Sequence, residues 1–424
     1  MTLWLIILGL VLLALSGAPL FAVIAAAALL GFHYADVDLS VIAIEIYRLT
    51  DTPLLVALPL FTFAGYLLAE SDTSHRLVRL SRSLLGWMPA ELVTVTLIAC
   101  ALFTAFTGAT GVTIVALGAL LYPALREVGY GDRFSLGLVT SAGSLGLLLP
   151  PSLPLILYAV VVQQLDIGAP FSLGQLFIAG ILPTLLMLFL LGIWSLWSTR
   201  HDVIPLQPFD RREAWAALKA ARWELPLPVV VLGGIYGGWF AVSEAAAMTA
   251  LYVLLVEVFL YREITLRALP RIMRESMIVV GGILLILGVS LAFTNYLVDA
   301  EVPVKLFEWT RAHIDDRITF LALLNVVLLI LGAFLDIFSA LVIMVPLLLP
   351  VALGYGISPI HLGIIFLANM QLGYLTPPVG LNLFIASYRF QRPVEEVYRA
   401  TLPFLLVLLV AVLLITYLPL LWYA

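Results

Sequence analysis

Long apolar segments separated by short polar ones run along almost the whole chain. Segments close to the ~17–25 residues that cross a bilayer lie at 2–16, 19–33, 53–70, 134–162, 171–198, 225–241, 245–261, 275–297, 359–387 and 400–421. Two further apolar stretches, at 90–125 and 318–353, are longer than one crossing requires. Because these segments contain few charges and have helical length, the pattern predicts an all-α integral membrane protein.

The composition agrees with this class and excludes others. The chain is 63% hydrophobic and 11% charged, whereas soluble domains are about 25% charged. A single cysteine, Cys100, excludes a disulfide framework or a cysteine metal cluster. Since the chain has no basic tract, nucleic acid is not an expected partner. The first apolar segment lacks a positively charged start, so we expect a retained span and not a signal peptide.

The positions of the basic residues indicate how the segments are oriented. Cytoplasmic loops accumulate Lys and Arg, and the 21 such residues lie outside the shorter apolar segments. Most share one side of the membrane if each of the two long stretches enters and leaves by the same face. The exceptions are Arg48, Lys305, Arg311 and Arg317, and acidic residues dilute the last three within 298–317. We therefore expect the side that holds these four residues to be periplasmic. Both chain termini are expected on the same side.

The same argument makes 90–125 and 318–353 re-entrant helical hairpins, the first open to the cytoplasm and the second to the outside. Each leg is about 15 residues long, or ~22 Å at the helical rise, which is short of the ~30 Å hydrocarbon core. The tips, FTGATG at 106–111 and FLDIFS at 334–339, should stop near the midplane.

A repeated motif interrupts two other apolar segments. GLLLPPS at 146–152 and GYLTPPV at 373–379 share G-x-L-x-P-P at an offset of 227 positions. A Pro-Pro pair unwinds a helix and frees carbonyl groups, which survive in lipid only inside protein or along a polar cavity. A proline kink repaired by neighbouring helices is the alternative. Because the hairpins beside the two motifs open to opposite sides, we interpret the halves as an inverted repeat, which is typical of secondary transporters.

Together with these motifs, further segments identify a family. The chain resembles the large membrane subunit of TRAP transporters, the tripartite ATP-independent periplasmic family within a superfamily of elevator-type ion symporters. The likeness covers essentially the whole sequence and is most specific in PLFTFAGYLLAE (59–70), LFTAFTGATGVTIVALGALLYPAL (102–125), TSAGSLGLLLPPSLPLILY (140–158), VLGGIYGGWFAVSEAAA (231–247), LGAFLDIFSALVIMVPLLLPVA (331–352) and GYLTPPVGLNLFIAS (373–387).

The resemblance implies a function and its partners. It implies sodium-driven import of organic anions, such as C4-dicarboxylates, other carboxylates or sugar acids, across the bacterial inner membrane. The expected partners are a small four-helix membrane subunit and a periplasmic substrate-binding protein. No cofactor is expected, with Na⁺ as the coupling ion.

The implied fold is an inverted-repeat elevator-type transporter with two re-entrant helical hairpins and two broken transmembrane helices. We expect scaffold helices and a first arm at 1–88, the first half of a transport domain at 89–170, scaffold helices at 171–297, a second arm at 298–317, the second half of the transport domain at 318–390 and a C-terminal helix at 391–424. Residues 72–88 and 298–317 are amphipathic, as expected of interfacial arms; ordinary connecting loops are the alternative.

The resemblance also implies sodium sites between each hairpin tip and the neighbouring broken helix. One site matches Thr107, Gly108 and Thr110 with the backbone at Gly146, Leu149 and Pro151. The other matches Gly332 and Asp336 with Gly373, Thr376 and Val379. Many family members have S-G-S at the first tip, where this chain has Thr107-Gly108-Ala109. Ala109 lacks the second hydroxyl, and either Thr110 or a carbonyl is expected to replace it. Asp336 is either an ion ligand or a cap of the tip helix.

Polar side chains beside the expected cavity are candidates for binding substrate. They are Ser144, Ser152, Ser339 and Asn382, although small polar residues also serve helix packing. The cavity segments contain no Lys or Arg, so neutralisation of an anion would fall to sodium and to helix N-termini.

Two other functions are weighed against this interpretation. An intramembrane enzyme needs paired carboxylates, an activated serine or H-E-x-x-H, and the sequence offers none of these within the membrane segments. There is no G-x-x-x-x-G-K-[ST] motif for ATP. A stand-alone symporter or antiporter of the same superfamily, working without a binding protein, stays open.

Overall fold

The computed structural model describes residues 9–10, 12–13, 16–49, 52–85, 91–165, 167–168, 171–200 and 209–419. The expected span at 2–16 lies mostly outside this part of the chain. Within it, the regular structure is helical and no strand is present.

The first half contains α2 (Leu20–Tyr34), α3 (Ser40–Arg48), α4 (Ala57–Glu70), α5 (Thr73–Leu85), α6 (Glu91–Thr107), α7 (Thr110–Val128), α8 (Asp132–Ala142), the 3-10 turn η3 (Leu145–Leu148), α9 (Leu153–Leu165) and α10 (Leu173–Ser198). The second half contains α11 (Arg211–Ala220), α12 (Pro226–Tyr236), α13 (Val242–Leu255), α14 (Leu269–Asp299), α15 (Val302–His313), α16 (Arg317–Phe334), α17 (Ile337–Gly354), α18 (Pro359–Gly373), α19 (Leu381–Phe390) and α20 (Val394–Tyr417).

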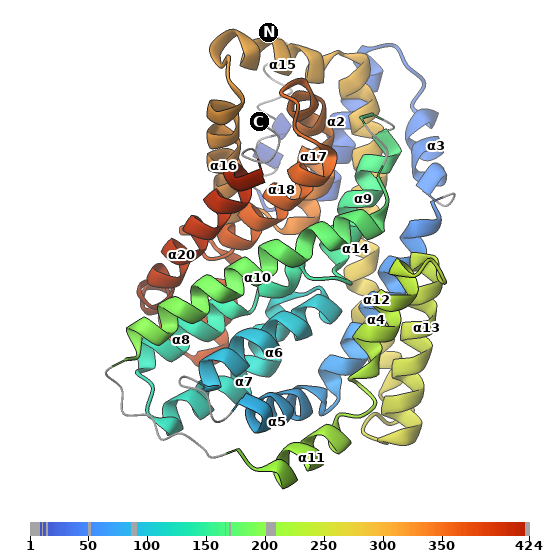
Figure 1. Ribbon diagram of the computed structural model, residues 1–424. Coiled ribbons are helices and arrows are strands. Elements are labelled where there is room, and N and C mark those ends of the chain that lie inside the picture. Colours follow the sequence, from blue (N-terminus) through green and yellow to red (C-terminus); the bar gives the residue numbers. More distant parts are fainter. Residues whose placement is uncertain are drawn as a thin grey trace.

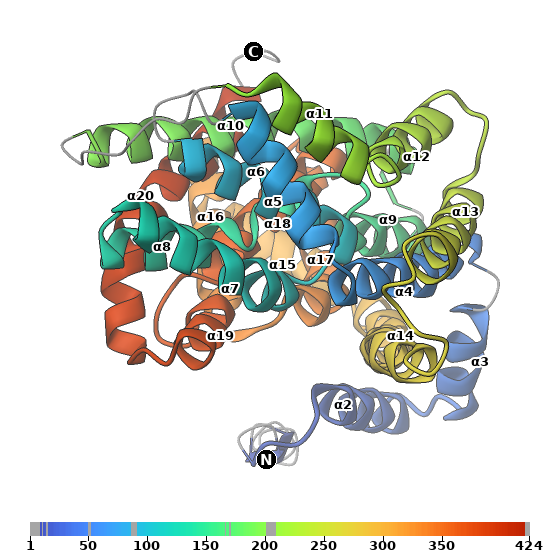
Figure 2. The same cartoon turned by 90° about the horizontal axis from the view of Figure 1, so that it is seen from below.

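The helices form two groups that lie side by side (Figure 1). An outer group contains α2, α3, α4, α12, α13 and α14, in which α4 packs on α13 and α14, and α14 packs on α2 and α3. An inner group contains α6 to α10 and α16 to α20, in which α8 packs on α20, α9 on α17, and α16 on α18. Figure 2 shows the same division from below.

Many of these helices have the dimensions of membrane spans. In the part of the chain that the structure describes, 8 helices are long and apolar enough to cross a bilayer, or up to 9 if the bent pair α4 and α5 counts as one span. The protein is therefore a multi-pass membrane protein, as its hydropathy predicts.

The two expected tips are helix breaks. Helix α6 ends at Thr107, Gly108 takes a left-handed φ of 64°, and the extended Ala109 leads into α7. Helix α16 ends at Phe334, and the extended Leu335 and Asp336 lead into α17. Glycine suits position 108, because residues with a side chain rarely adopt a positive φ.

The legs of these two hairpins are longer than predicted. Helices α6, α7, α16 and α17 have 17, 19, 18 and 18 residues instead of about 15. Each tip uses only two residues, and internal prolines such as Pro123 do not end their helices. Since α7, α16 and α17 each qualify as a span by length, leg length does not separate a re-entrant hairpin from a crossing pair.

Both Pro-Pro motifs interrupt their segments, as predicted. The first segment consists of α8, η3 and α9, and the second of α18 and α19. The peptide bonds Pro150–Pro151 and Pro377–Pro378 are both cis. Residues 153–162 of α9 are all buried, so the first break lies inside the protein, where non-helical backbone is tolerated at membrane depth.

Other predicted boundaries need correction. The segment 225–241 forms only the 11 residues of α12, about 16 Å long, because the helix ends at Gly237 and Gly238, the latter with φ 69°. Helix α14 has 31 residues and begins before the predicted 275. Short helices α3 and α11 lie between the predicted segments.

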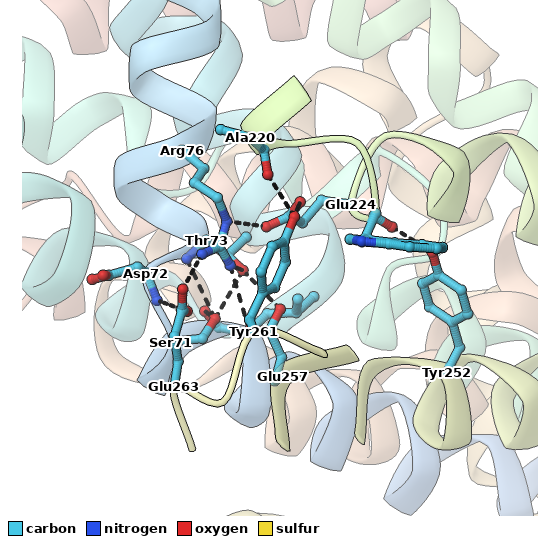
Figure 3. Close-up of polar contacts among 12 residues, drawn as sticks. Ser71, Asp72, Thr73, Arg76, Ala220, Glu224, Tyr252, Glu257, Tyr261 and Glu263 are labelled. Carbon is cyan, nitrogen blue, oxygen red and sulfur yellow. Dashed lines mark hydrogen bonds and ion pairs between the residues drawn. The ribbon is translucent and has the colours of Figure 1, made fainter. Parts of the chain in front are cut away.

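The expected arms are helices at opposite ends of the molecule, α5 at the bottom and α15 at the top of Figure 1. Helix α5 is bent by 72° from α4. An ionic network fixes this elbow (Figure 3). Arg76 forms ion pairs with Glu224, Glu257 and Glu263, and its guanidinium lies 4.0 Å from the ring centre of Tyr261.

Candidate transport cavity

A cavity of about 820 Å³ lies where the two hairpin tips, the second helix break and the outer group meet. Outer helices α4 and α14 form one wall, and the first tip with the start of α7 forms another. The second tip and α19 complete it. The described lining residues are Tyr66, Ala69, Glu70, Gly108, Ala109, Thr110, Gly111, Val112, Val115, Ala116, Leu147, Glu275, Asp336, Ile337, Phe338, Tyr374, Leu381, Phe384, Ile385 and Tyr388.

The first tip packs against both sides of the first break. On one side, Thr104 of α6 donates its hydroxyl to the carbonyl of Gly143 at 2.9 Å. Gly146 lies so close to the α6 backbone that a Cβ would collide with Ala101. On the other side, a Cβ on Gly108 would meet the side chain of Leu153 at 2.5 Å. The structure therefore brings the tip residues of the first predicted sodium site to its broken helix.

The second tip packs on the second break in the same manner. A Cβ on Gly332 would lie 3.0 Å from the Cα of Gly373, so these two backbones touch. Across the tip, the Gly380 N–H donates to the carbonyl of Ala333 at 3.0 Å. The Ile337 N–H donates to the Tyr374 hydroxyl at 2.7 Å. Gly332 and Gly373 of the second predicted site are thus neighbours.

The two breaks differ in exposure. Pro150 and Pro151 are buried, whereas Pro377, Pro378 and Val379 are exposed. The second break is nevertheless held, because the Tyr398 hydroxyl donates to the carbonyl of Pro378. At the remaining predicted ligands, the Thr376 hydroxyl donates to the Leu372 carbonyl at 3.0 Å, and Leu149 is half-buried.

Asp336 caps the helix of the second tip. Its carboxylate accepts hydrogen bonds from the N–H groups of Phe338 and Ser339, both at 3.0 Å, and from the Ser339 hydroxyl. The carboxylate therefore caps the tip helix, and its role as an ion ligand stays a prediction. The residue is also exposed and lines the cavity, so its carboxylate borders the space where an ion or substrate would bind.

Helix α7 differs from α17 because no side chain caps it. Its N-cap residue is Ala109, which has no oxygen to accept from the first-turn N–H groups. Residues 108–112 all line the cavity. This helix therefore presents its partly positive N-terminus to the cavity.

The predicted substrate residues are not among the described lining residues. Ser144 donates to the Ser141 carbonyl at 3.4 Å, Ser152 to the Leu147 carbonyl, and Ser339 to Asp336. Asn382 differs, because it is fully buried and both its amide atoms lack a partner in the described part of the chain. Its neighbour Leu381 lines the cavity.

Sequence reasoning missed the acidic and aromatic lining. Glu70 and Glu275 contribute carboxylates from the outer group, and Arg271 forms ion pairs with both. The motif at 59–70 held a signal, because Tyr66 and Glu70 are four residues apart and share a helix face. Among the described lining residues, every ionised side chain is acidic.

Broken helices beside a cavity in a multi-pass membrane protein are typical of secondary transporters. A family model described as "Tripartite ATP-independent periplasmic transporter, DctM component" matches residues 5–421, so the chain belongs to this family.

Similar proteins agree with this assignment, and a solved transporter structure shares the fold. The chain is 34% identical over 396 residues to the C4-dicarboxylate TRAP transporter large permease protein DctM of Rhodobacter capsulatus, covering 92% of this chain and 90% of the relative. It is 31% identical to the ectoine/5-hydroxyectoine large permease UehC of Ruegeria pomeroyi, covering 95% and 94%. The YdaH transporter of Alcanivorax borkumensis has the same fold, with a TM-score of 0.65, 17% identity, and coverage of 91% and 88%.

Proposed function

We propose that this chain is the large membrane subunit of a TRAP transporter that couples sodium entry to the import of an organic anion across the bacterial inner membrane. It would work with a small membrane subunit and receive substrate from a periplasmic binding protein. The observation that supports this most directly is the meeting of both hairpin tips at one cavity, each tip packed on a proline-broken helix.

The charge of the cavity supports sodium coupling. Three carboxylates line it, those of Glu70, Glu275 and Asp336. Arg271 forms ion pairs with Glu70 and Glu275 and offsets part of their negative charge. A carboxylate substrate entering such a site is repelled by carboxylates in a medium of reduced dielectric constant. Bound sodium reverses this, and the uncapped N-terminus of α7 supplies N–H donors for the anion.

The sodium ions would bind at the two contacts between tip and break. Thr107, Gly108 and Thr110 with the backbone of Gly146, Leu149 and Pro151 form the first site. The second uses Gly332, Asp336, Gly373, Thr376 and Val379. Hard cations take oxygen ligands, and these segments provide carbonyls, hydroxyls and one carboxylate. The unpaired amide of Asn382 is a further donor and acceptor beside the cavity.

Elevator movement would carry the inner group past the outer group. The hairpins would be re-entrant from opposite faces, consistent with arms α5 and α15 at opposite ends of the molecule (Figure 1). Helix α10 begins the segment expected to be scaffold, but it packs on α18, α20 and η3. We therefore propose that α10 and α20 move with the inner group.

Uptake into proteoliposomes tests the proposal. The chain would be reconstituted with a small membrane subunit and offered a C4-dicarboxylate, sialic acid or ectoine, the substrate classes of its relatives, with a binding protein. Uptake of at least one compound should require an inward sodium gradient. Equal uptake in sodium and potassium gradients would overturn the coupling, and uptake without the binding protein would favour the stand-alone symporter.

A further inference from the structure

A second cavity of about 820 Å³ lies on the outside of the inner group, away from the transport cavity. Helix α10 forms one side, and the starts of α16 and α18 with the end of α20 form the other. The described lining residues are Ile178, Ala179, Leu182, Pro183, Leu186, Arg317, Gly356, Ser358, Ile360, His361, Ile364, Leu414, Ile415, Leu418 and Pro419. We call it the α10 groove.

The α10 groove is lined mainly by apolar side chains and also contains a cationic one. Its apolar wall follows α10 from Ile178 to Leu186, about 12 Å at the helical rise, and Leu182 is 73% exposed there. Arg317, His361 and the first turn of α18 also line the groove. Among the described lining residues, Arg317 is the one permanently charged side chain.

Arg317 lacks a partner that would account for its position. No ion pair joins it to another described residue, and its buried Nε has no hydrogen-bond partner there. The neighbouring Asp316 is engaged in capping α16, where it accepts from the Thr319 N–H at 2.7 Å. A buried guanidinium N–H without an acceptor is costly, and guanidinium groups form strong charge-assisted hydrogen bonds with phosphates and carboxylates.

We propose that the α10 groove binds an anionic phospholipid, with the headgroup phosphate on Arg317 beside the start of α18 and an acyl chain along Ile178, Leu182 and Leu186. Two features favour a lipid over a soluble anion. The same groove holds the cation and the apolar side chains of α10, and the positions of the basic residues predict that Arg317 lies on the outer side of the membrane. An anion without a chain would leave the apolar part of the groove unfilled.

Tryptophan quenching by brominated lipid tests this proposal. Leu182→Trp places a reporter in the groove, and Leu285→Trp on α14, also exposed at 54%, reports on ordinary lipid contact. Each variant is reconstituted in phosphatidylcholine vesicles with increasing brominated phosphatidylglycerol, and the signal of the parent protein is subtracted. The L182W reporter should reach half-maximal quenching at a mole fraction about tenfold lower than L285W. Equal half-maximal fractions would overturn the proposal.

A second variant tests the headgroup contact. Arg317→Gln in the L182W background should remove the preference, whereas Arg311→Gln, which changes the same charge outside the groove, should keep it. Brominated phosphatidylcholine in a phosphatidylglycerol background should quench L182W only at a higher mole fraction than L285W, because phosphatidylglycerol then occupies the groove. Persistence of the preference in R317Q, with the protein still monodisperse, would contradict a phosphate site at Arg317.

Discussion

The hydroxyl of Thr110 is a predicted ligand of the first proposed sodium site. Thr110 is buried at the start of α7, directly after the alanine that lacks a hydroxyl. Thr110→Val keeps the shape and removes the oxygen. We expect the sodium concentration for half-maximal uptake to rise about tenfold, equivalent to ~1.4 kcal/mol for one bond to a charged partner. Thr96→Val is the control, because that hydroxyl only donates to the Leu92 carbonyl. Unchanged sodium dependence in T110V would show that a carbonyl serves instead.

Asn382 and Asn325 allow a predicted binding residue to be compared with a structural one. Because both its amide atoms are buried without described partners, Asn382→Leu should leave the melting temperature unchanged or higher, while uptake falls at least tenfold. Asn325 gives the opposite case. It accepts from Asn369 at 2.6 Å and from Thr416 at 3.1 Å, so Asn325→Leu should destabilise the protein by about 1–3 kcal/mol. Normal uptake by N382L would remove Asn382 from the site.

At the scale of elements, the elbow between α4 and α5 depends on Arg76. One guanidinium faces Glu224, Glu257 and Glu263, and Glu257 is fully buried. Removing the cation leaves buried carboxylates uncompensated, which costs about 3–5 kcal/mol. Arg76→Gln should therefore lower the melting temperature strongly and reduce transport, measured by thermal unfolding in detergent and by uptake.

The neighbouring Arg79 provides the matched control for that prediction. It pairs with Glu213 at 2.7 Å, but both side chains are about half exposed. The hydrogen bond from Arg79 lowers the pKa of Glu213, yet solvent screening makes such an exposed pair contribute little to stability. Arg79→Gln should thus behave like the parent protein, and equal losses in both variants would contradict a special role for the elbow.

Local chemistry explains which elements could be predicted from the sequence. The breaks at Gly108 and at both Pro-Pro pairs follow from backbone rules that act within a few residues. The predicted leg lengths were too short, because a proline such as Pro123 is tolerated inside a long apolar helix in its tertiary setting. The acidic lining of the cavity, Glu70 and Glu275, was missed because it depends on which helices pack together, and hydropathy does not encode that.

At the scale of the whole molecule, the outer and inner groups have different contacts with the cavity. The outer group contributes one wall through α4 and α14, while the inner group contributes both tips and the second break. All the predicted ligands of both sodium sites belong to the inner group. The proposed elevator movement would preserve these predicted ion sites if it shifted the inner group as one body against that wall without opening either tip from its break.

Distances between the two groups test this movement directly. With Cys100, the single native cysteine, replaced by alanine, spin labels at Leu182 of α10 and Leu251 of α13 mark the inner and outer groups at exposed positions. We expect sodium with substrate to shift their distance distribution by at least about one helical turn, ~5 Å. A pair within the outer group, Leu251 and Leu285, should keep its distribution. If the first pair also stays constant while uptake is active, transport proceeds by local opening of the tips and the inner group does not travel as a body.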